Sequence, residues 1–338
     1  MNRFFFRRLP SIGLAVALLF PLLAACGNSD ALVIYSGRQQ ALVGDLLGKL
    51  EKELGMDVEV RYGGSAEMAA QLLEEKEPEA DLFYSQDSGA LGALTEAGKL
   101  ATLPRDDLDI VDKRFQADDG SWVATSARAR VVAYDPKQVS EQDLPSDLDD
   151  LLDEKWRGKV GYAPSNGSWQ AFVTAVRQLK GEDGARDWLV KFKQNNPQAY
   201  ENNVLIRDAV DKGEVALGLI NHYYYHRKIA EEGAENVNVK LHYVGGNDPL
   251  ALINVAGVGV IKGSDKAEAA QRAVRYLLSE SAQQYFADET AEYPVREGVT
   301  STKHDLPKLS GIESPDIDLS SLSSLKETLA LLQEVGLS

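Results

Sequence analysis

Residues 31–50, ALVIYSGRQQALVGDLLGKL, contain the unit from which most of this chain is built. A short apolar run leads into the polar turn Ser36-Gly37-Arg38, and apolar residues then recur with the spacing of one helical face. The stretch therefore predicts a strand, a tight turn and a helix. Two more units of this kind follow, with strands predicted over 58–62 and 80–84. Three such units in succession predict an open α/β sheet, whose ligands bind beyond the carboxyl ends of the strands.

A second α/β block follows, and two long apolar stretches connect it to the first. Residues 122–134 and 253–261 predict strands that cross between the blocks. The second block contains predicted strands over 160–163 and 215–220 and a predicted helix over 169–179. A mature chain of roughly 310 residues exceeds what one hydrophobic core usually organises. We therefore expect an α/β fold with two lobes, which close by a hinge motion on a ligand in the cleft between them.

The N-terminus has the three parts of an export signal. Three arginines, an apolar run over 12–23 and small residues before Cys26 occur in that order, as in a secretory signal peptide. The stretch Leu23-Ala24-Ala25-Cys26 resembles a bacterial lipobox, so we expect cleavage after residue 25 and acylation of Cys26. The alternatives are an ordinary signal peptide and an N-terminal membrane helix, although about a dozen apolar residues are few for a span of roughly 20.

The cysteine count and the charge exclude several kinds of function. Because Cys26 is the only cysteine, we expect no internal disulfide, no thiolate metal cluster and no cysteine nucleophile in the fold. A bound metal would use oxygen or nitrogen ligands. The formal net charge of -16 argues against nucleic acid as a partner and modestly favours a cationic solute. No Gly-x-Ser-x-Gly motif lies at a strand-to-helix turn, and without any other catalytic constellation we expect no enzyme.

The most informative polar stretch is INHYYYHR, from Ile220 to Arg227, before a helix predicted to begin at Lys228. A phenol has a pKa near 10, so a tyrosine ligand demands a cation acidic enough to displace the proton, and ferric ion is the common biological candidate. Adjacent side chains on a regular helix diverge by about 100°, whereas at a loop that enters a helix they can converge. The alternative is an aromatic wall between helix and sheet, with hydroxyls that reach water.

A second polar site is predicted at Pro164 to Ser168, where a turn opens a helix. Backbone N–H groups and two serine hydroxyls can bind an anion there, although an ordinary N-cap is the alternative. Arg38 and Arg128 could each present a planar fork to carbonate or phosphate, or could form surface ion pairs instead. His222 and His226 have the i, i+4 spacing of a divalent-metal pair on a helix face, which is a further alternative.

Seven motifs, in order along most of the mature chain, carry a family resemblance. They are YSGR (35–38), FYSQDSGALGAL (83–94), SARARVVAYD (126–135), GYAPSNGSWQAF (161–172), YENN (200–203), INHYYYHR (220–227) and EYPV (292–295). With these motifs the chain resembles the ferric-iron-binding periplasmic proteins of ABC importers, of the bacterial-transferrin type. The resemblance implies the two-lobed class II periplasmic binding protein fold, in which the second lobe interrupts the first.

The resemblance also implies roles for individual residues. Tyr223 and Tyr224 match the paired iron-binding tyrosines of the family. The positions that match an accompanying anion's contacts in family members are Gly167, Ser168, Asn203, Asn221, Arg38 and Arg128. The anion implied is carbonate, bicarbonate or phosphate.

The loops of the first lobe depart from one pattern in the family. Members with a histidine and a glutamate as iron ligands carry them where this chain has Gln39 and Gln86, and amides are much weaker ligands for ferric ion. The chain therefore resembles the subgroup in which tyrosines and a synergistic anion carry the binding. Asp87 is the nearest carboxylate, for which we expect a helix-capping role. Gln39, Gln86, Asp87 and Tyr225 are candidate cleft contacts.

These features lead us to expect a ferric-iron-binding lipoprotein that captures Fe3+ with an anion and delivers it to the permease of an ABC transporter. It would be an exported monomer, periplasmic or at the cell surface, anchored to a membrane through its lipid. The alternative is the same fold binding a small oxyanion or an organic solute for import; an exported α/β hydrolase is more remote. The expected domains are residues 1–25 as signal peptide, 26–30 as lipidated tether, 31–127 plus about 256–300 as first lobe, 128–255 as second lobe and 301–338 as C-terminal helical segment.

Overall fold

The computed structural model describes residues 30–338. The predicted signal peptide and the predicted acylation of Cys26 lie outside the described residues. Within the described part of the chain, no helix is long and apolar enough to cross a membrane. Residues 31–338 pack as one unit, and the lobe boundaries given above stay a prediction.

The N-terminal units form the parallel strands β1 (Leu32–Ser36), β2 (Val58–Tyr62) and β3 (Leu82–Ser85). Beside β3 runs β9 (Ile253–Val260), which is antiparallel both to β3 and to β4 (Val123–Tyr134). The order in this half of the sheet is β2-β1-β3-β9-β4. Because β1 and β3 are parallel neighbours, the loops that follow them lie at the same edge of the sheet.

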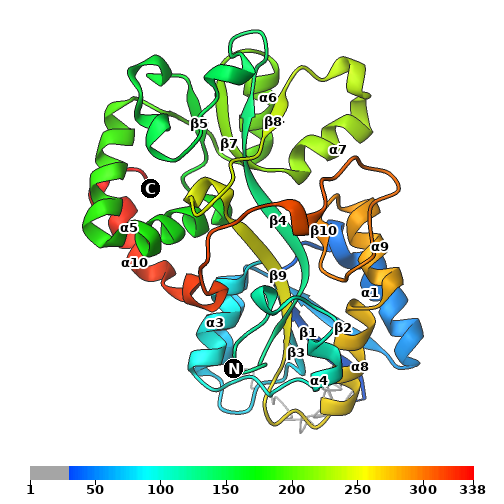
Figure 1. Ribbon diagram of the computed structural model, residues 1–338. Coiled ribbons are helices and arrows are strands. Elements are labelled where there is room, and N and C mark those ends of the chain that lie inside the picture. The colour runs from blue at the N-terminus through cyan, green and yellow to red at the C-terminus, as the bar shows by residue number, and fades with distance from the viewer. Residues whose placement is uncertain (1–29) are drawn as a thin grey trace, which may run out of the picture. The chain divides into compact units, whose positions relative to one another are not determined.

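Strand β4 belongs to both halves of the sheet. Its residues 123–129 pair with β9, and its residues 130–134 pair with β7 (Leu217–Asn221). Figure 1 shows β4 and β9 running between two groups of elements, as predicted for crossing strands. The second group continues in the order β7-β5-β6. The remaining strands are β5 (Val160–Tyr162), β6 (Gln198–Ala199), β8 (Lys240–His242) and β10 (Tyr293–Pro294).

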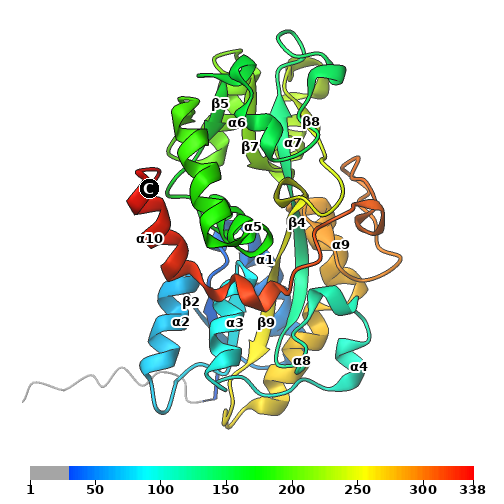
Figure 2. The same cartoon turned by 60° about the vertical axis from the view of Figure 1, so that its left-hand side comes forward.

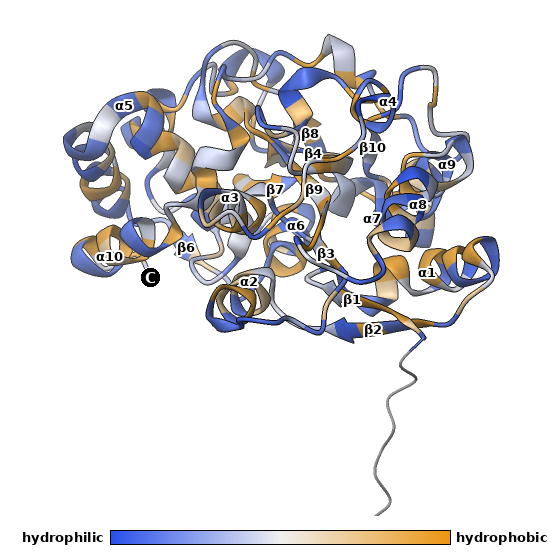
Figure 3. Cartoon of the chain, turned by 90° about the horizontal axis from the view of Figure 1, so that it is seen from below, coloured by the Kyte–Doolittle hydropathy of each residue, from blue (hydrophilic) through white to orange (hydrophobic). Residues whose placement is uncertain are grey.

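Helices connect the strands, and Figure 3 shows many hydrophilic residues on outlying helices such as α5 and α9. The α-helices are α1 (Gln40–Leu54), α2 (Ser65–Glu74), α3 (Ser88–Glu96), α4 (Arg105–Leu108), α5 (Gly167–Gln194), α6 (Asn203–Asp211), α7 (Tyr223–Glu232), α8 (Ala267–Leu277), α9 (Glu280–Glu289) and α10 (Leu325–Val335). The short 3₁₀ helices are η1 (Lys113–Phe115), η2 (Glu141–Asp143), η3 (Asp149–Leu152), η4 (Glu154–Trp156), η5 (Ala234–Asn236), η6 (Pro249–Ala251), η7 (Leu309–Gly311) and η8 (Leu319–Ser323).

Two helices differ from the ranges predicted. Helix α5 extends well beyond 169–179, because Gly181, with φ 73°, lets the chain kink and continue as a second helical stretch. The prediction that the later helix begins at Lys228 is wrong, because α7 begins at Tyr223. His222 already has helical φ and ψ of -56° and -39°, so β7 runs into α7 without a loop. Aromatic residues have modest helix propensity, and tertiary contacts override it here.

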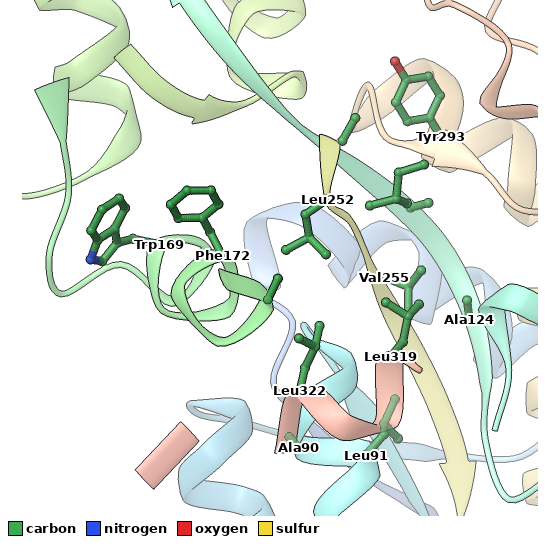
Figure 4. Packing of buried hydrophobic residues seen from close by; sticks show 14 of the residues in the cluster. Ala90, Leu91, Ala124, Trp169, Phe172, Leu252, Val255, Tyr293, Leu319 and Leu322 are labelled. Atoms are coloured by element: carbon green, nitrogen blue, oxygen red, sulfur yellow. The ribbon is translucent and has the colours of Figure 1, made fainter. Parts of the chain in front are cut away.

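An aromatic cluster packs the two helical stretches of α5 against each other, and Tyr162 of β5 joins it through Trp169 and Phe192. Trp169, Phe172, Trp188 and Phe192 form successive ring contacts, with centroids between 4.9 and 6.1 Å apart. Trp169 and Phe172 are fully buried, and both project from the start of α5 (Figure 4). The cluster therefore fixes the turn over 164–168, which the sequence identified as a candidate anion site.

The C-terminal segment 301–338 is helical only in part and contacts both groups of elements. Its 3₁₀ helix η8 packs on α3 through Leu319 and Leu322 (Figure 4). A Cβ added at Gly92 of α3 would lie 2.0 Å from the carbonyl oxygen of Ser320, so glycine is required for this approach. Helix α10 then packs on α5 (Figure 2). The segment thus joins α3 to α5, the helices whose N-terminal ends lie near the site described next.

Candidate functional site

Tyr223 and Tyr224 lie in the first turn of α7, directly after β7. Their rings stack with centroids 4.2 Å apart and planes at 29°, although neighbouring positions on a helix point about 100° apart. Tyr223 is 7% exposed, and Tyr224 is partly buried. The start of the helix thus presents two phenols side by side, as a tyrosine-pair metal site requires.

Contacts from three other elements hold the start of α7 in place. The Ala129 N–H of β4 donates to Nδ1 of His222 at 3.2 Å, and the His222 N–H donates to the Ala129 carbonyl oxygen at 3.1 Å. The His222 ring stacks on Tyr293 of β10, with centroids 4.2 Å apart. Arg207 of α6 donates through Nη1 to the Tyr224 carbonyl oxygen at 2.9 Å. The backbone that carries the tyrosine pair is therefore fixed before any ligand binds.

Burial and the neighbouring ring disfavour the ionised, phenolate form of Tyr223 in the absence of a cation. Burial raises the pKa of Tyr223 well above 10, and Tyr224 raises it further, whereas Arg128 acts in the opposite direction. Tyr223 is therefore a phenol in the ligand-free protein at neutral pH. A ligand that binds through their oxygens must displace protons from a buried site, and only a hard, highly charged cation stabilises two adjacent phenolates enough to do so.

Two buried arginines of β4 lie near the tyrosine pair. Arg128 and Arg130 are two residues apart in a strand, so their side chains leave the same face roughly 7 Å from each other. Arg128 interacts electrostatically with Tyr223, and Arg130 interacts with Tyr224. Nη2 of Arg128 donates to the backbone carbonyl oxygen of Gln86, and its Nε has no partner. The structure thus places each tyrosine near an arginine.

Arg130 is the site residue that the sequence analysis missed. It is 3% exposed, its Nη1 donates to Oγ of Ser168 at 3.2 Å, and its Nε and Nη2 have no partner. Its guanidinium carbon lies 5.0 Å from the centroid of the Phe172 ring. None of the ion pairs formed by the described residues includes Arg130. The available signal was the charge itself, because SARARVV places a second arginine in an otherwise apolar strand.

The contacts of Arg130 do not compensate the free-energy cost of burying its charge. Burial lowers the pKa of Arg130 to about 9, and Tyr224 only partly opposes this, so the side chain is still a cation at neutral pH. A cation–π contact such as that with Phe172 contributes about 0.5 to 2 kcal/mol. Taking an ion out of water costs several kcal/mol. The protein therefore maintains an unfavourable buried charge beside the candidate site.

Ser168 connects α5, α6 and β4. Oδ1 of Asn166, the N-cap of α5, accepts from the Ser168 N–H at 2.9 Å and from its hydroxyl at 2.7 Å. Ser168 Oγ also accepts from Arg130 and, at 3.0 Å, from Nδ2 of Asn203. A hydroxyl offers one donor and two acceptor sites, so all three are used. Of the other predicted anion contacts, Gly167 is exposed, and Oδ1 of Asn203 has no partner.

Arg38 lies in a different setting, although it is also fully buried. Its Nη1 and Nη2 donate to the Glu292 carboxylate at 2.9 and 2.6 Å, and Nη1 also donates to Oε1 of Gln86 at 2.8 Å. Burial would raise the pKa of Glu292, but the charge and hydrogen bonds of Arg38 outweigh it and lower the pKa to about 2. Glu292, of the EYPV motif, is thus the partner of Arg38. The prediction that Arg38 contacts an anion stays untested, with Nε as its only unpartnered nitrogen.

The remaining candidates of the first group lie in the loops after β1 and β3. Gln39 is exposed, and Gln86 is partly buried with its side-chain oxygen occupied by Arg38. Oδ1 of Asp87 accepts from the Ala90 N–H at 3.0 Å and caps α3. The expected capping role of Asp87 is therefore confirmed.

Asn221 and Tyr225 flank the tyrosine pair on either side along the chain. Asn221 ends β7 and is paired in register with Arg130 of β4, so the two side chains leave the same face of the sheet. Burial raises the pKa of Tyr225, and its electrostatic neighbours are Tyr134 and Asp305 rather than the arginines of β4. Asn221 therefore shares a face with the site, whereas Tyr225 belongs to another environment.

The alternative histidine pair gains no further ligand. The ring centroids of His222 and His226 are 6.0 Å apart, and Nδ1 of His222 is already the acceptor for Ala129. Burial lowers the pKa of His222 to about 3 and that of His226 to about 4. In the described residues, no group of three or more His, Cys, Asp or Glu side chains could hold a metal ion.

Comparison with known proteins decides the family. A family model described as bacterial extracellular solute-binding protein matches residues 77–319. The chain belongs to this family. Its members are solute-binding proteins rather than enzymes, so the prediction that this solute-binding protein is not an enzyme is confirmed.

Individual relatives of this solute-binding protein are named for ferric iron. The Fe(3+)-binding periplasmic protein of Serratia marcescens is 32% identical, over 98% of this chain and 99% of its own length. Iron-bound HitA from Pseudomonas aeruginosa has a TM-score of 0.83 and 36% identity, covering 91% of this chain and 99% of that one. The Trichodesmium protein IdiA, or FutA, in complex with iron and citrate has a TM-score of 0.78 and 25% identity, covering 91% and 100%. The predicted family resemblance and the two-lobed α/β fold are confirmed.

Proposed function

We propose that this solute-binding protein captures ferric iron together with a synergistic anion and delivers it to the permease of an ABC transporter. Tyr223 and Tyr224 donate phenolate oxygens to Fe3+, and carbonate, bicarbonate or phosphate completes the coordination shell. The observation that carries the proposal is the stacked tyrosine pair at the end of β7, with an arginine of β4 close to each ring. The ferric-binding relatives support the same solute.

Proton release accompanies capture in this mechanism. Tyr223 enters as a phenol and leaves its proton to solvent when Fe3+ binds, so iron affinity falls as the solution becomes more acidic. Arg128 stabilises the phenolate of Tyr223. The anion offsets the charge of the cation that remains after two phenolates have bound. Gln39 and Gln86 supply no strong ferric donor, which makes the anion the necessary further ligand.

The anion is held between the two groups of elements by groups that donate hydrogen bonds, and Ser168 joins them by turning its hydroxyl from Asn166 to the anion. The proposed contacts are Arg38, Arg128, Gly167, Ser168, Asn203 and Asn221. In support, Arg128 keeps an unpartnered Nε in a buried position. Citrate accompanies iron in the Trichodesmium structure, so a carboxylate-bearing chelator is a further candidate for this chain.

The place of action follows from the family and the N-terminal sequence. We propose that the protein is exported and works as a monomer, anchored to a membrane by acyl groups on Cys26, while the permease receives its iron-loaded form. The extracellular family and the periplasmic relatives support export. Acylation is tested by the mass of the mature protein: Cys26→Ser should remove both the acyl mass and membrane association.

A visible spectrum tests the tyrosine–iron proposal. Phenolate bound to ferric ion absorbs visible light through ligand-to-metal charge transfer, whereas the iron-free protein is colourless. Titration of the metal-stripped soluble domain with ferric citrate at neutral pH should give a saturable orange or red band. The band should disappear in the double variant Tyr223→Phe, Tyr224→Phe and persist in the control Tyr276→Phe, which lies on the outlying helix α8. A correctly folded wild type that shows no band would sink the proposal.

The second candidate function is import of a small oxyanion or organic solute by the same fold. Its supporting observation is the pair of buried arginines, Arg128 and Arg130, neither of which forms an ion pair among the residues that the structure describes. In that case the tyrosines are walls of the binding site, and the double phenylalanine variant retains its solute affinity. The double variant therefore separates the two functions.

A further inference from the structure

The tyrosine pair belongs to a longer series of buried rings. Tyr223 meets the His222 ring edge-on, with centroids 6.1 Å apart and planes at 85°. The His222 ring in turn stacks on Tyr293 of β10, with centroids 4.2 Å apart and planes at 19°. His222 is fully buried and Tyr293 is 1% exposed, so neither ring can turn without displacing close-packed neighbours. The ring of Tyr293 therefore restrains His222, the residue directly before the pair.

The stack of Tyr293 on His222 spans the point where β4 changes its neighbours. Tyr293 pairs with Ala127 of β4, whereas His222 is bonded through its backbone and its ring to Ala129. Up to Ala129 the strand β4 pairs with β9, and from Arg130 it pairs with β7. Hinges are made by a few residues at the ends of elements or between them. A hinge motion of the two groups at this change of partner would therefore move Tyr293 relative to His222.

A second contact joins Tyr293 to the second group of elements. Its hydroxyl lies 3.0 Å from the hydroxyl of Tyr243, which directly follows β8. Strand β8 pairs with residues 132–134 of β4, the part of β4 that also pairs with β7. Tyr293 itself follows α9 and pairs with the earlier part of β4. Tyr293 thus holds the second group by its ring face and by its hydroxyl, and substitutions can remove the two contacts separately.

The turn that leads into β10 is strained. Ala291 has a φ of 56° and is fully buried. Among the described residues, Asn196 is the only other non-glycine residue with a positive φ, and asparagine adopts this conformation more readily than alanine. The backbone carbonyl of Ala291 acts on the His222 ring, and the next residue, Glu292, pairs with Arg38. Such strain persists where the surrounding structure requires it, and it is commonest at functional sites.

We propose that Tyr293 is a positioning residue that couples hinge motion at β4 to the orientation of the tyrosine pair. This inference rests on the proposed function and adds regulation of the same site to it. In the arrangement of this structure, the Tyr293 ring fixes His222, and His222 fixes Tyr223 for iron binding. When the groups rotate at the change of partner on β4, the stack on His222 is sheared, Tyr223 loses its orientation, and Fe3+ is released more easily. Iron retention thus depends on a contact that no iron ligand makes.

The setting of Tyr223 can be measured without iron, which separates this proposal from the proposed function. The metal-stripped protein is labelled with ¹³C at the ring ζ-carbon of tyrosine, and Tyr223→Phe identifies the resonance of Tyr223. Tyr293→Leu removes the stacking ring, whereas Tyr293→Phe and Tyr243→Phe keep the ring and remove the contact between the two hydroxyls. Tyr293→Leu should shift the resonance of Tyr223, and the two phenylalanine variants should leave it unchanged.

The rate of iron loss gives the functional readout. Each iron-loaded protein is mixed with excess EDTA, and the decay of the visible charge-transfer band gives the rate. Loss of a residue that orients metal ligands typically weakens metal binding about 10- to 100-fold, so Tyr293→Leu should lose iron at least about tenfold faster than the wild type. Tyr293→Phe and Tyr243→Phe should stay within about twofold of it, because the stack remains. The stability control is Leu50→Ala, which removes a fully buried side chain of α1 and should lower the melting temperature without changing the rate.

Ala291→Gly provides a second test if Tyr293→Leu does not fold. This variant keeps every ring, and glycine adopts a positive φ without strain, so the protein should fold. The freer turn holds Tyr293 less firmly, and iron should be lost several-fold faster than from the wild type.

A wild-type resonance and a wild-type rate in Tyr293→Leu overturn the proposal, as they do in Ala291→Gly when Tyr293→Leu does not fold. Equal acceleration of iron loss in Tyr293→Phe and Tyr293→Leu also overturns it, because the stack would then not be the contact that matters. The same holds if Leu50→Ala accelerates iron loss as much as Tyr293→Leu. If no iron binds to any of these proteins, the proposed function fails, whereas the iron-free resonance still decides whether Tyr293 positions Tyr223.

Discussion

Arg38 and Arg130 are both fully or almost fully buried arginines near the same tyrosine pair, yet their surroundings are opposite. Arg38 donates to both oxygens of Glu292 and to Gln86. Arg130 has one hydroxyl partner and two unpartnered nitrogens. The first charge is neutralised within the fold, whereas the second has no ion pair among the residues that the structure describes. We therefore expect Arg38 to act in the architecture of the fold and Arg130 to act in ligand binding.

The difference between Arg38 and Arg130 also reflects the elements that surround each of them. Arg38 and Gln86 come from the loops after β1 and β3, and Glu292 precedes β10, so their ion pair ties together the loops of the first group. Arg130 is surrounded instead by α5, α6 and α7, which carry Ser168, Asn203 and the tyrosines. The first group thus offers the site the ion pair that joins its loops, and the second group surrounds an arginine with two unpartnered nitrogens.

Breaking the Arg38 pair should have the largest effect on stability. Arg38→Met leaves the Glu292 carboxylate buried without its cation, and such a change costs about 3 to 5 kcal/mol. Urea unfolding of the iron-free protein measures this loss. Arg38→Met combined with Glu292→Leu should recover much of the stability, because an apolar pair can replace a buried ion pair. A single variant as stable as the wild type would show that Arg38 and Glu292 do not depend on each other.

Acid should remove a similar part of the stability. The pKa of Glu292 is about 2 in the folded protein and about 4.3 in an unfolded chain. A depressed carboxyl pKa contributes stability that is complete above the unfolded value and is lost as pH falls towards the folded value, amounting to about 3 kcal/mol. Unfolding free energies measured between pH 6 and pH 3 should therefore fall more steeply in the wild type than in Glu292→Gln. Parallel slopes would contradict the assigned ionisation of Glu292.

The strands and caps that depend on local sequence pattern could be predicted from the sequence. The strands of the three N-terminal units and the long β4 follow from apolar runs and turns, and the capping of α3 by Asp87 follows from its position before an apolar-periodic stretch. The adjacent tyrosines at the end of β7 were also recognisable, since INHYYYHR follows a buried strand.

What the sequence could not provide was pairing between distant residues. Arg38 and Glu292 are 254 residues apart, so nothing local distinguishes the paired arginine from the unpaired Arg130. The start of α7 at Tyr223 depends on contacts from β4, β10 and α6, which helix propensity does not include. The candidate anion residues were therefore named as a set, without indicating which of them keeps a free donor.

Replacing Arg130 should change stability in the opposite direction to replacing Arg38. Arg130→Met removes an unpaired buried charge and places an apolar chain beside Phe172, so the iron-free and anion-free protein should gain about 1 to 3 kcal/mol. Urea unfolding in a buffer without phosphate or bicarbonate measures the gain. If the site binds an oxyanion as proposed, saturating phosphate should reduce the difference, because Arg130→Met lacks the guanidinium donors. A loss of several kcal/mol would mean that Arg130 is an architectural residue like Arg38.

We expect the smallest effect on stability at Ser168. This residue also allows the coupling between Ser168 and Arg130 to be measured. Ser168→Ala removes the acceptor of Arg130 and Asn203 together with the donor to Asn166, and we expect a loss of about 1 to 2 kcal/mol. Ser168→Ala should cost less in an Arg130→Met background. The Arg130 donor, which Ser168→Ala leaves without its acceptor in the wild type, is already absent there. A double-mutant cycle by urea unfolding gives this coupling directly. Zero coupling would show that Ser168 stabilises the turn of α5 without holding Arg130, and the orientation of the Arg130 guanidinium would then need another cause.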